Sequence, residues 1–290
     1  MSLEFRLLGR LEVVDEGREV DLGARKQRAL LCLLALHVNR VVTTDRILDE
    51  LWGDEAAGKE KALWVAISRL RSALEPGREG GRGAVVQTRD HGYTLSVEPN
   101  SIDLVRFEAA INEARAVVQR DPAAALSRAG DALALWRGAP LEEFQHEQFA
   151  QSEVARLGEL WLEAQELRAE TLLHLGRARE QVGVLDALHR EHPWRERLID
   201  LLMRSLYQAG QHAEALRVYD RYRRSIGDEL GIEPSPELRR LEEQILLHDP
   251  SVRGTDERAG PAAVNPFKGL RPFGEDDAGD YFGRDRLWSM

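Results

Sequence analysis

Hydrophobic and polar residues alternate at the start of the chain and then change to a helical spacing. The alternation predicts three short strands, at 3–8, 11–14 and 20–22. A strongly apolar stretch over 26–38 predicts a helix. The Thr-Thr-Asp sequence at 43–45 can then cap the start of another helix, which we expect to end near Trp52.

The stretch from Lys59 to Tyr93 combines an amphipathic helix with a hairpin. At ~100° per residue, the helix over 59–74 has one apolar side, formed by Leu63, Ala66, Ile67, Leu70 and Leu74. The opposite side is polar, with an indole and a guanidinium on its flanks: Lys61, Ser68 and Ser72, then Trp64 and Arg69. After a Gly- and Arg-rich gap, the sequence AVVQTRDHGYTL predicts a hairpin with Arg89 and His91 near its tip.

A helix followed by a basic β-wing is a common way for a small domain to enter a DNA major groove and touch the flanking backbone. The side chains suit this task, because Arg can bind guanine O6 and N7 and an aromatic group can contact the thymine methyl. The alternative is an ordinary surface helix with a solvated charged face, which would be favoured for a basic helix alone. The wing and the preceding strands favour a DNA-binding winged helix.

Longer motifs support this interpretation. The sequences RLRSALEP at 69–76, VQTR at 86–89 and HGY at 91–93 closely resemble the OmpR-type winged helix. The sequences KQRALL at 26–31 and DELWG at 49–53 narrow the resemblance further. Together they resemble the Streptomyces antibiotic regulatory protein (SARP) family of actinobacterial transcriptional activators.

The resemblance implies that the third helix reads the major groove and that the wing arginine lies along the backbone or minor groove. Carried over to this chain, these roles fall on Lys61, Trp64, Ser68, Arg69 and Arg71, with Arg89 in the wing. The hairpin tip adds His91 and the helix start adds Thr44 as further candidate DNA-binding residues. Lys61 and Trp64 occupy variable positions of the family helix, so Arg69 is the stronger candidate for base contact. The helix that starts at Thr44 would present its free N–H groups to a phosphate.

From residue 101 to about 250, Leu and Ala recur at helical spacing and strand patterns are almost absent, which predicts an all-helical second domain. A repeat is visible within it. Gly176 and Gly210 are 34 residues apart, and each is followed by a second helix, at 178–190 and 212–225. This period is that of tetratricopeptide repeats, in which stacked helix pairs bury one another's apolar faces.

The same domain resembles the bacterial transcriptional activation domain that follows the winged helix in this family. Its motifs are LALWRG at 133–138, HPWRERL at 192–198 and DELGIEPSPEL at 228–238. In the family this domain serves dimerisation and contact with the transcription machinery, which implies a homodimer on DNA and RNA polymerase (sigma or alpha subunit) as a partner. We expect structural roles, in helix packing and in bracing helix ends, for Trp136, Trp194, Arg195 and Arg197.

The last 40 residues have a different character. Residues 251–265 have the small, polar composition of a linker. The sequence NPFKGLRPFGEDDAGDYFGRDRL that follows resembles the lead-in to a STAND-type signalling NTPase, so we expect a linker and tail over 251–290. No G-x-x-x-x-G-K-[ST] motif occurs in the sequence, and no nucleotide or other cofactor is predicted.

Charge narrows the possible functions. The formal net charge of the 290 residues is -10, so the whole molecule repels DNA at long range, but seven cations and only four anions lie between Lys59 and His91. This local excess suits a specific DNA binder with weak non-specific affinity. The histidines lack zinc-site spacing, the single Cys32 cannot form a disulfide within the chain, and no stretch is long enough to cross a membrane. We therefore expect a cytoplasmic protein without a metal site.

The sequence predicts a mainly α protein with a small β component, in which a winged helix-turn-helix domain (1–98) precedes an all-α tetratricopeptide-like domain (101–250). No paired carboxylate, nucleophile or metal constellation stands out, so we expect no enzyme. The expected function is sequence-specific activation of transcription, of secondary-metabolism or related genes, by a dimer on direct repeats. The alternative is a helical-repeat adaptor or sensory module whose winged helix does not bind DNA. Retention of Arg69, Arg71 and Arg89 favours the activator.

Overall fold

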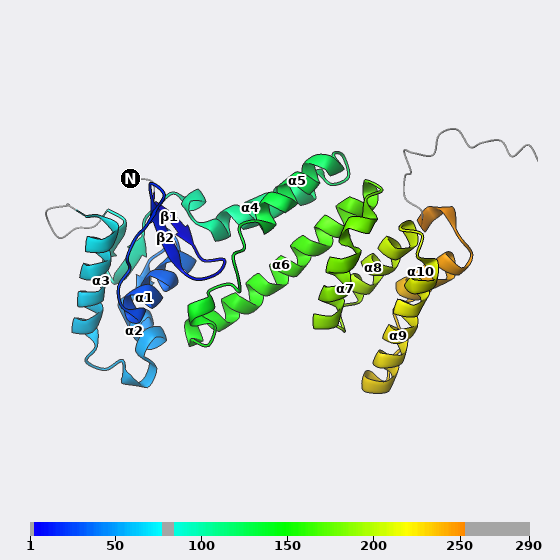
Figure 1. Ribbon diagram of the computed structural model, residues 1–290. Helices are drawn as coiled ribbons and strands as arrows, with labels where there is room; N and C mark the ends of the chain where they lie inside the picture. Colours follow the sequence, from blue (N-terminus) through cyan, green and yellow to red (C-terminus); the bar gives the residue numbers. More distant parts are fainter. Residues whose placement is uncertain (1–2, 77–83, 253–290) are drawn as a thin grey trace, which may run out of the picture. The chain divides into compact units, whose positions relative to one another are not determined.

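The computed structural model describes residues 3–76 and 84–252 (Figure 1). An antiparallel sheet opens the chain, in the order β1 (Leu3–Arg6), β2 (Glu12–Asp15), β3 (Arg18–Glu19). Three helices follow, α1 (Arg25–Leu36), α2 (Thr44–Trp52) and α3 (Glu60–Leu74). A second sheet has the order β4 (Val42–Thr43), β6 (Gly92–Leu95), β5 (Val86–Arg89). The predicted winged helix is confirmed, whereas the expected tail lies outside the described residues from 253 onward.

The third strand lies earlier than the sequence pattern predicted. Glu16 and Gly17 have φ values of 48° and 82°, which form a two-residue turn directly after β2. The strand that pairs with β2 therefore lies beside the turn, at 18–19, and a hydrogen bond from the Val20 N–H to the Val13 carbonyl at 2.8 Å continues the pairing by one residue. Leu22, which suggested a strand, is instead buried in the core.

The two-residue strand β4 is not predicted by the sequence, because it is too short to show an alternation. It pairs with β6, the second strand of the wing. A Cβ atom on Gly92 would lie 2.0 Å from the carbonyl oxygen of Val42, so only glycine allows the two strands to approach this closely. The glycine of the HGY motif therefore joins the wing to the body of the domain.

Seven α-helices complete the described chain: α4 (Asp103–Val117), α5 (Pro122–Leu133), α6 (Gln148–His174), α7 (Val182–Glu191), α8 (Glu196–Gln208), α9 (His212–Leu230) and α10 (Pro236–Leu246). Caps fix two of their starts. Asp121 accepts the N–H of Ala124 at 2.9 Å, Ser235 accepts that of Leu238 at 3.2 Å, and a proline follows each cap. None of the helices in the described ranges is long and apolar enough to cross a membrane.

The two glycines of the predicted repeat have the same geometry. Gly176 and Gly210 have φ values of 65° and 80°, and the residue after each donates its N–H to the carbonyl five positions back at 2.8 Å. Each glycine therefore ends a helix and lets the next one fold back (Figure 1). The following helices differ slightly from prediction: a 3₁₀ turn at Ala178–Gln181 precedes α7, and α9 continues to Leu230.

Two hydrophobic cores hold the described chain together. The first extends from Phe5 of β1 to Leu167 of α6, and so contains the winged helix together with α4 and α5. The second extends from the later part of α6 to α10 and Val252. The 27-residue helix α6 contributes to both. Packing is therefore continuous across the domain boundary that the sequence predicts near residues 98–101.

Buried polar contacts reinforce this continuity. The carboxylate of Asp103, which is 1% exposed, accepts the N–H groups of Leu7 at 2.8 Å and Leu8 at 3.0 Å. Burial raises the pKa of Asp103 above its usual value, although these N–H groups oppose the shift. On α1, Arg28 donates from Nε to Glu143 Oε2 at 2.7 Å. Residues from the two predicted domains thus satisfy one another's hydrogen bonds.

The structural roles expected for the motif tryptophans and arginines are only partly found. Trp136 packs in the first core, with its ring edge-on to Phe107 at 5.3 Å. Trp194 is 43% exposed, so its expected role in helix packing is wrong, because it lies in the turn between α7 and α8. Arg195 and Arg197 form ion pairs with glutamates of α6 at 2.6 and 2.7 Å, and so brace the start of α8 as expected.

Candidate nucleic-acid interface

The helix α3 is anchored through its apolar face. Leu63, Ile67 and Leu70 are at most 1% exposed and pack in the first core, where α3 contacts α1. Burial of each such side chain contributes about 1.5–3 kcal/mol. This anchorage fixes the rotation of the helix about its own axis, so the opposite face is presented outward.

The outward face of α3 carries Lys61, Trp64 and Ser68, which lie one helical turn apart and form what we call the outward row. All three side chains are exposed, and the indole of Trp64 is 64% exposed. One turn further on, Ser72 donates its hydroxyl to the Ser68 carbonyl at 3.1 Å. Within the described ranges, neither Lys61 nor Trp64 has a hydrogen-bond, ion-pair or ring partner. The row is thus available to a ligand.

The two arginines of α3 lie on opposite flanks of the outward row, ~160° apart at 100° per residue. Arg69 is exposed and has no hydrogen bond or ion pair to any residue that the structure describes. Arg71 is partly buried, and it donates from Nε to the Val86 carbonyl and from Nη2 to Thr88 Oγ1, each at 2.8 Å. Arg71 therefore links α3 to β5, a role that its sequence position did not predict.

Glu75 makes a second link between α3 and the wing. It directly follows α3 and is only 7% exposed. Its Oε1 accepts the N–H of Ala84 at 2.7 Å and that of Val85 at 2.6 Å, just before β5. Together with Arg71 it fixes where the wing leaves the helix. This role could not be predicted from the sequence, because a glutamate at a helix end is most often solvated.

The wing tip carries the predicted Arg89 and His91, and both are exposed. Arg89 donates from Nη2 to Gln87 Oε1 at 2.6 Å, so its guanidinium lies along β5. The carbonyl of His91 accepts the N–H of Thr44 at 2.9 Å. The wing tip is thereby tied to the start of α2.

The start of α2 has fewer free N–H groups than the sequence suggested. The cap is Thr43, whose Oγ1 accepts the N–H of Arg46 at 3.3 Å. The N–H of Thr44 already binds His91, and Asp45 adds a negative charge to the first turn. Two of the N–H groups that could attract a phosphate are therefore used within the protein.

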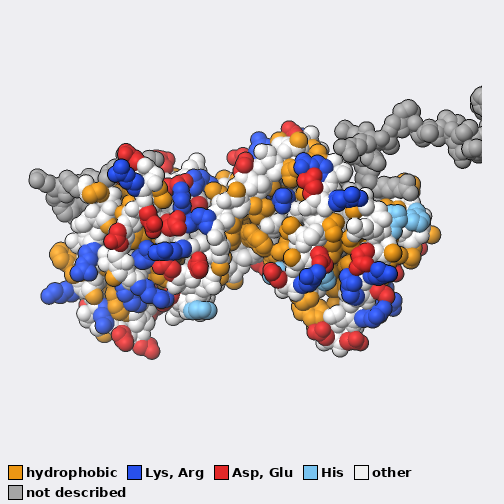
Figure 2. Space-filling model, viewed as in Figure 1, with side chains coloured by type: hydrophobic (Ala, Val, Ile, Leu, Met, Phe, Trp, Pro, Cys, Tyr) orange, Lys and Arg blue, Asp and Glu red, His pale blue; other side chains and the backbone are white. Residues whose placement is uncertain are grey.

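The winged helix carries two further cations outside 59–91: Arg46 lies on α2, and Arg40 lies just before it. Both are exposed; Arg46 is 3.7 Å from Glu50, and the Arg40 side chain has no partner in the described part of the chain. Burial and then the charges of Arg46 and Arg40 lower the pKa of His37. The view in Figure 2 shows Lys and Arg side chains over the helices of the winged helix. The sequence offered no reason to include these two, because they lie on and just before α2, outside the 59–91 stretch.

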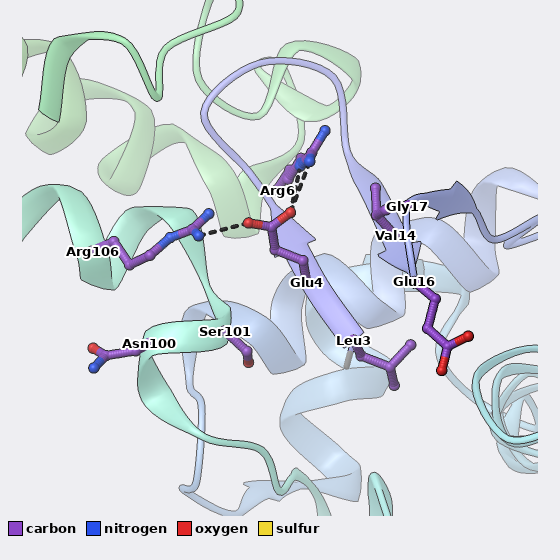
Figure 3. A pocket seen from close by; sticks show the side chains of 9 residues that line it. All are labelled: Leu3, Glu4, Arg6, Val14, Glu16, Gly17, Asn100, Ser101 and Arg106. Atoms are coloured by element: carbon purple, nitrogen blue, oxygen red, sulfur yellow. Dashed lines mark hydrogen bonds and ion pairs between the residues drawn. The ribbon is translucent and has the colours of Figure 1, made fainter. Parts of the chain in front are cut away.

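A separate pocket of about 500 Å³ lies beside β1 and the start of α4 (Figure 3). Glu4 lies between two arginines there, with Oε2 at 2.7 Å from Arg6 and Oε1 at 2.6 Å from Arg106. The hydrogen bond from Arg6, with that from Arg106, outweighs burial and lowers the pKa of Glu4. The charges of Glu4, Arg6 and Arg106 are therefore paired within the protein. Among the described residues, no group of three His, Cys, Asp or Glu side chains could hold a metal ion.

Two family descriptions match the chain. Residues 17–95 match "Transcriptional regulatory protein, C terminal", and residues 102–246 match "Bacterial transcriptional activator domain", which covers half of the chain. Both are transcription-regulatory domains, in agreement with the expectation that the protein is not an enzyme.

Several curated relatives are similar over most of this chain. Regulatory protein DnrI of Streptomyces peucetius is 34% identical over 89% of this chain and 96% of its own length. Regulatory protein AfsR of Streptomyces coelicolor is 36% identical over 94% of this chain, but the chain spans only 28% of that protein. Transcriptional regulatory protein EmbR of Mycobacterium tuberculosis is 35% identical over 86% of this chain, which spans 64% of it.

A solved structure agrees with these sequence matches. The structure of Mycobacterium tuberculosis EmbR in complex with a low affinity phosphopeptide has a TM-score of 0.80 and 32% identity to this chain. The match covers 87% of this chain and 68% of that one. On these combined matches, the chain belongs to the Streptomyces antibiotic regulatory protein (SARP) family of transcriptional regulators, with an OmpR-type winged helix followed by a bacterial transcriptional activator domain.

Proposed function

We propose that this chain is a sequence-specific DNA-binding activator that reads DNA with the outward face of α3. The observation that supports this most strongly is the outward row of Lys61, Trp64 and Ser68, which is exposed while the opposite face of the helix is buried. A major groove about 12 Å wide admits such a helix. The three side chains of the row are exposed, so docking requires no rearrangement of the core.

Arg69 and Lys61 supply the main polar contacts in this proposal. The guanidinium of Arg69 is exposed and has no partner in the described ranges, so it can bind guanine O6 and N7 in a bidentate manner. Lys61, near the start of the helix, suits a phosphate or a guanine. Arg89 and His91 extend the contact to the neighbouring backbone from the wing tip.

Arg71 and Thr44 act mainly through the protein in this proposal. Arg71 holds β5 against α3, so it sets the position of the wing relative to that helix. Thr44 ties α2 to the wing through its N–H. Each of them would therefore affect DNA binding by positioning Arg89 and His91.

The finer parts of the function rest on membership of the family. We infer that two copies bind a direct repeat whose halves are about one DNA turn apart, ~10–10.5 bp. We further infer that the helical domain contacts the sigma or alpha subunit of RNA polymerase and that secondary-metabolism or related genes are the targets. Footprints with protected segments in phase on one face of the duplex support the repeat, and a single unphased segment contradicts it.

A mobility-shift titration on a duplex selected from a random library tests the role of Arg69. We expect Arg69→Ala to raise the Kd by about 10- to 100-fold, the range for loss of one bidentate base contact. Arg240→Ala is the matched control, because Arg240 is an exposed arginine on α10, and it should leave the Kd unchanged. Unchanged affinity and sequence preference in a folded Arg69→Ala protein would contradict the assignment.

A further inference from the structure

We infer that Trp64 reads the 5-methyl group of a thymine, so that the target sequence requires thymine under the middle of α3. The inference rests on the proposed function, because it assumes that α3 lies in the major groove. It adds the identity of a base to that proposal and assigns its recognition to one side chain.

The exposure of Trp64 has no explanation in the folding of the domain. An aromatic side chain of this size buries 150–250 Å² when it packs, yet 64% of this one remains exposed. The helix is already anchored by Leu63 and Ile67 on its opposite side. Trp52 and Trp136, in contrast, are partly buried against the first core.

Along the helix axis, Trp64 lies between the two polar members of the outward row. Lys61 lies one turn before it and Ser68 one turn after it, and both present hydrogen-bonding groups. Trp64 instead presents an apolar surface with a single N–H donor. Lys61 and Ser68 would therefore form hydrogen bonds with the outer base pairs, and Trp64 would make an apolar contact with the base pair between them.

The chemistry of the major groove then selects the base. Each base edge there displays hydrogen-bonding groups, and the thymine methyl is the apolar feature. An indole pressed against a guanine or adenine edge would exclude water from two hydrogen-bonding groups, and its single N–H cannot satisfy both, which is unfavourable. Against thymine, the same indole covers a methyl group. Contact with Trp64 is thus favourable for thymine and unfavourable for guanine and adenine.

Single-base replacement of thymine by deoxyuridine tests this inference, since deoxyuridine lacks only the 5-methyl group. The full chain is titrated with its selected duplex and with duplexes carrying one replacement each. We expect the wild type to lose about fourfold in affinity at one or two positions, the effect of burying one methyl-sized group. Trp64→Ala should bind the thymine and deoxyuridine duplexes equally at those positions.

Trp194→Ala is the matched control, because Trp194 is also an exposed tryptophan but lies outside the winged helix; it should retain the wild-type difference. Thermal melting of both variants verifies that they fold. A wild type that keeps its sequence preference but tolerates every replacement overturns the inference and leaves the proposed function intact. A Trp64→Ala protein that still distinguishes the thymine and deoxyuridine duplexes as the wild type does also overturns only the inference. A wild type with no sequence preference overturns both the inference and the proposed function.

Discussion

At the scale of single residues, Gly92 is the position where the wing tolerates least change. A methyl group there would lie 2.0 Å from the Val42 carbonyl oxygen, so Gly92→Ala must separate β4 from β6. We expect it to lower the free energy of unfolding by about 1–3 kcal/mol, as overpacking typically does. Urea denaturation measures this. Gly130→Ala is the control: a Cβ there meets nothing within 4 Å, and alanine should stabilise α5 by about 0.5–1 kcal/mol. A Gly92→Ala protein as stable as the wild type would show that the wing does not depend on this approach.

The sequence identifies candidate DNA-binding residues but does not distinguish the role of each one. Arg69 and Arg71 are two positions apart in one motif, and the sequence predicts DNA contact for both. Helical rotation places them on opposite flanks, and only Arg71 meets the carbonyl of Val86 and the hydroxyl of Thr88. These partners lie 15 and 17 residues later, so their approach depends on how the wing folds back. No local pattern carries that information.

At the scale of elements, α3 and the wing act as one unit because Arg71 and Glu75 join them. We expect Arg71→Ala to speed amide hydrogen exchange in β5 by about tenfold, since a hydrogen bond from a charged group contributes about 1.5–3 kcal/mol and this one is partly exposed. Arg69→Ala, two residues away, should leave that exchange unchanged. Equal exchange in the two variants would mean that Arg71 does not hold the wing.

Strongly periodic elements are the ones that the sequence predicts well. The helix expected over 59–74 is α3 at Glu60–Leu74, and both repeat glycines end helices as expected. The two short strands β4 and β3 are the exceptions. Strand β4 has two residues and exists only because β6 pairs with it, and β3 is placed by the positive φ values of its turn.

At the scale of the whole molecule, the winged helix and α4–α6 share one core. The sequence could not predict this, because each domain shows its own motifs and the contacts between them are distant along the chain. A fragment of residues 1–98 would lose Asp103, which satisfies the N–H groups of Leu7 and Leu8. We expect this fragment to lack the cooperative thermal transition of a 1–252 fragment. A fragment 1–98 that melts cooperatively at the same temperature would contradict the shared core.

The Arg28–Glu143 pair makes the same junction sensitive to pH. Burial alone would raise the pKa of Glu143, but the hydrogen bond and charge of Arg28 outweigh it, so the pKa lies below its usual 4.5. A lowered pKa stabilises the fold above pH 4.5, and this contribution is lost as the pH falls through the folded-state value. We expect Glu143→Gln to lower stability at pH 7 and to reduce the loss between pH 5 and pH 3, measured by urea denaturation. An unchanged pH profile would mean that the pair contributes nothing.

In the proposed function, the outward face of α3 determines which DNA sequence the protein binds. Selection from a random duplex library tests it most directly, with the wild type and a variant in which Lys61, Trp64, Ser68 and Arg69 are all alanine. These side chains are exposed, so the variant should fold, as thermal melting will verify. We expect the wild type to enrich one sequence pattern and the variant to enrich none. Enrichment of the same pattern by both proteins would contradict the account.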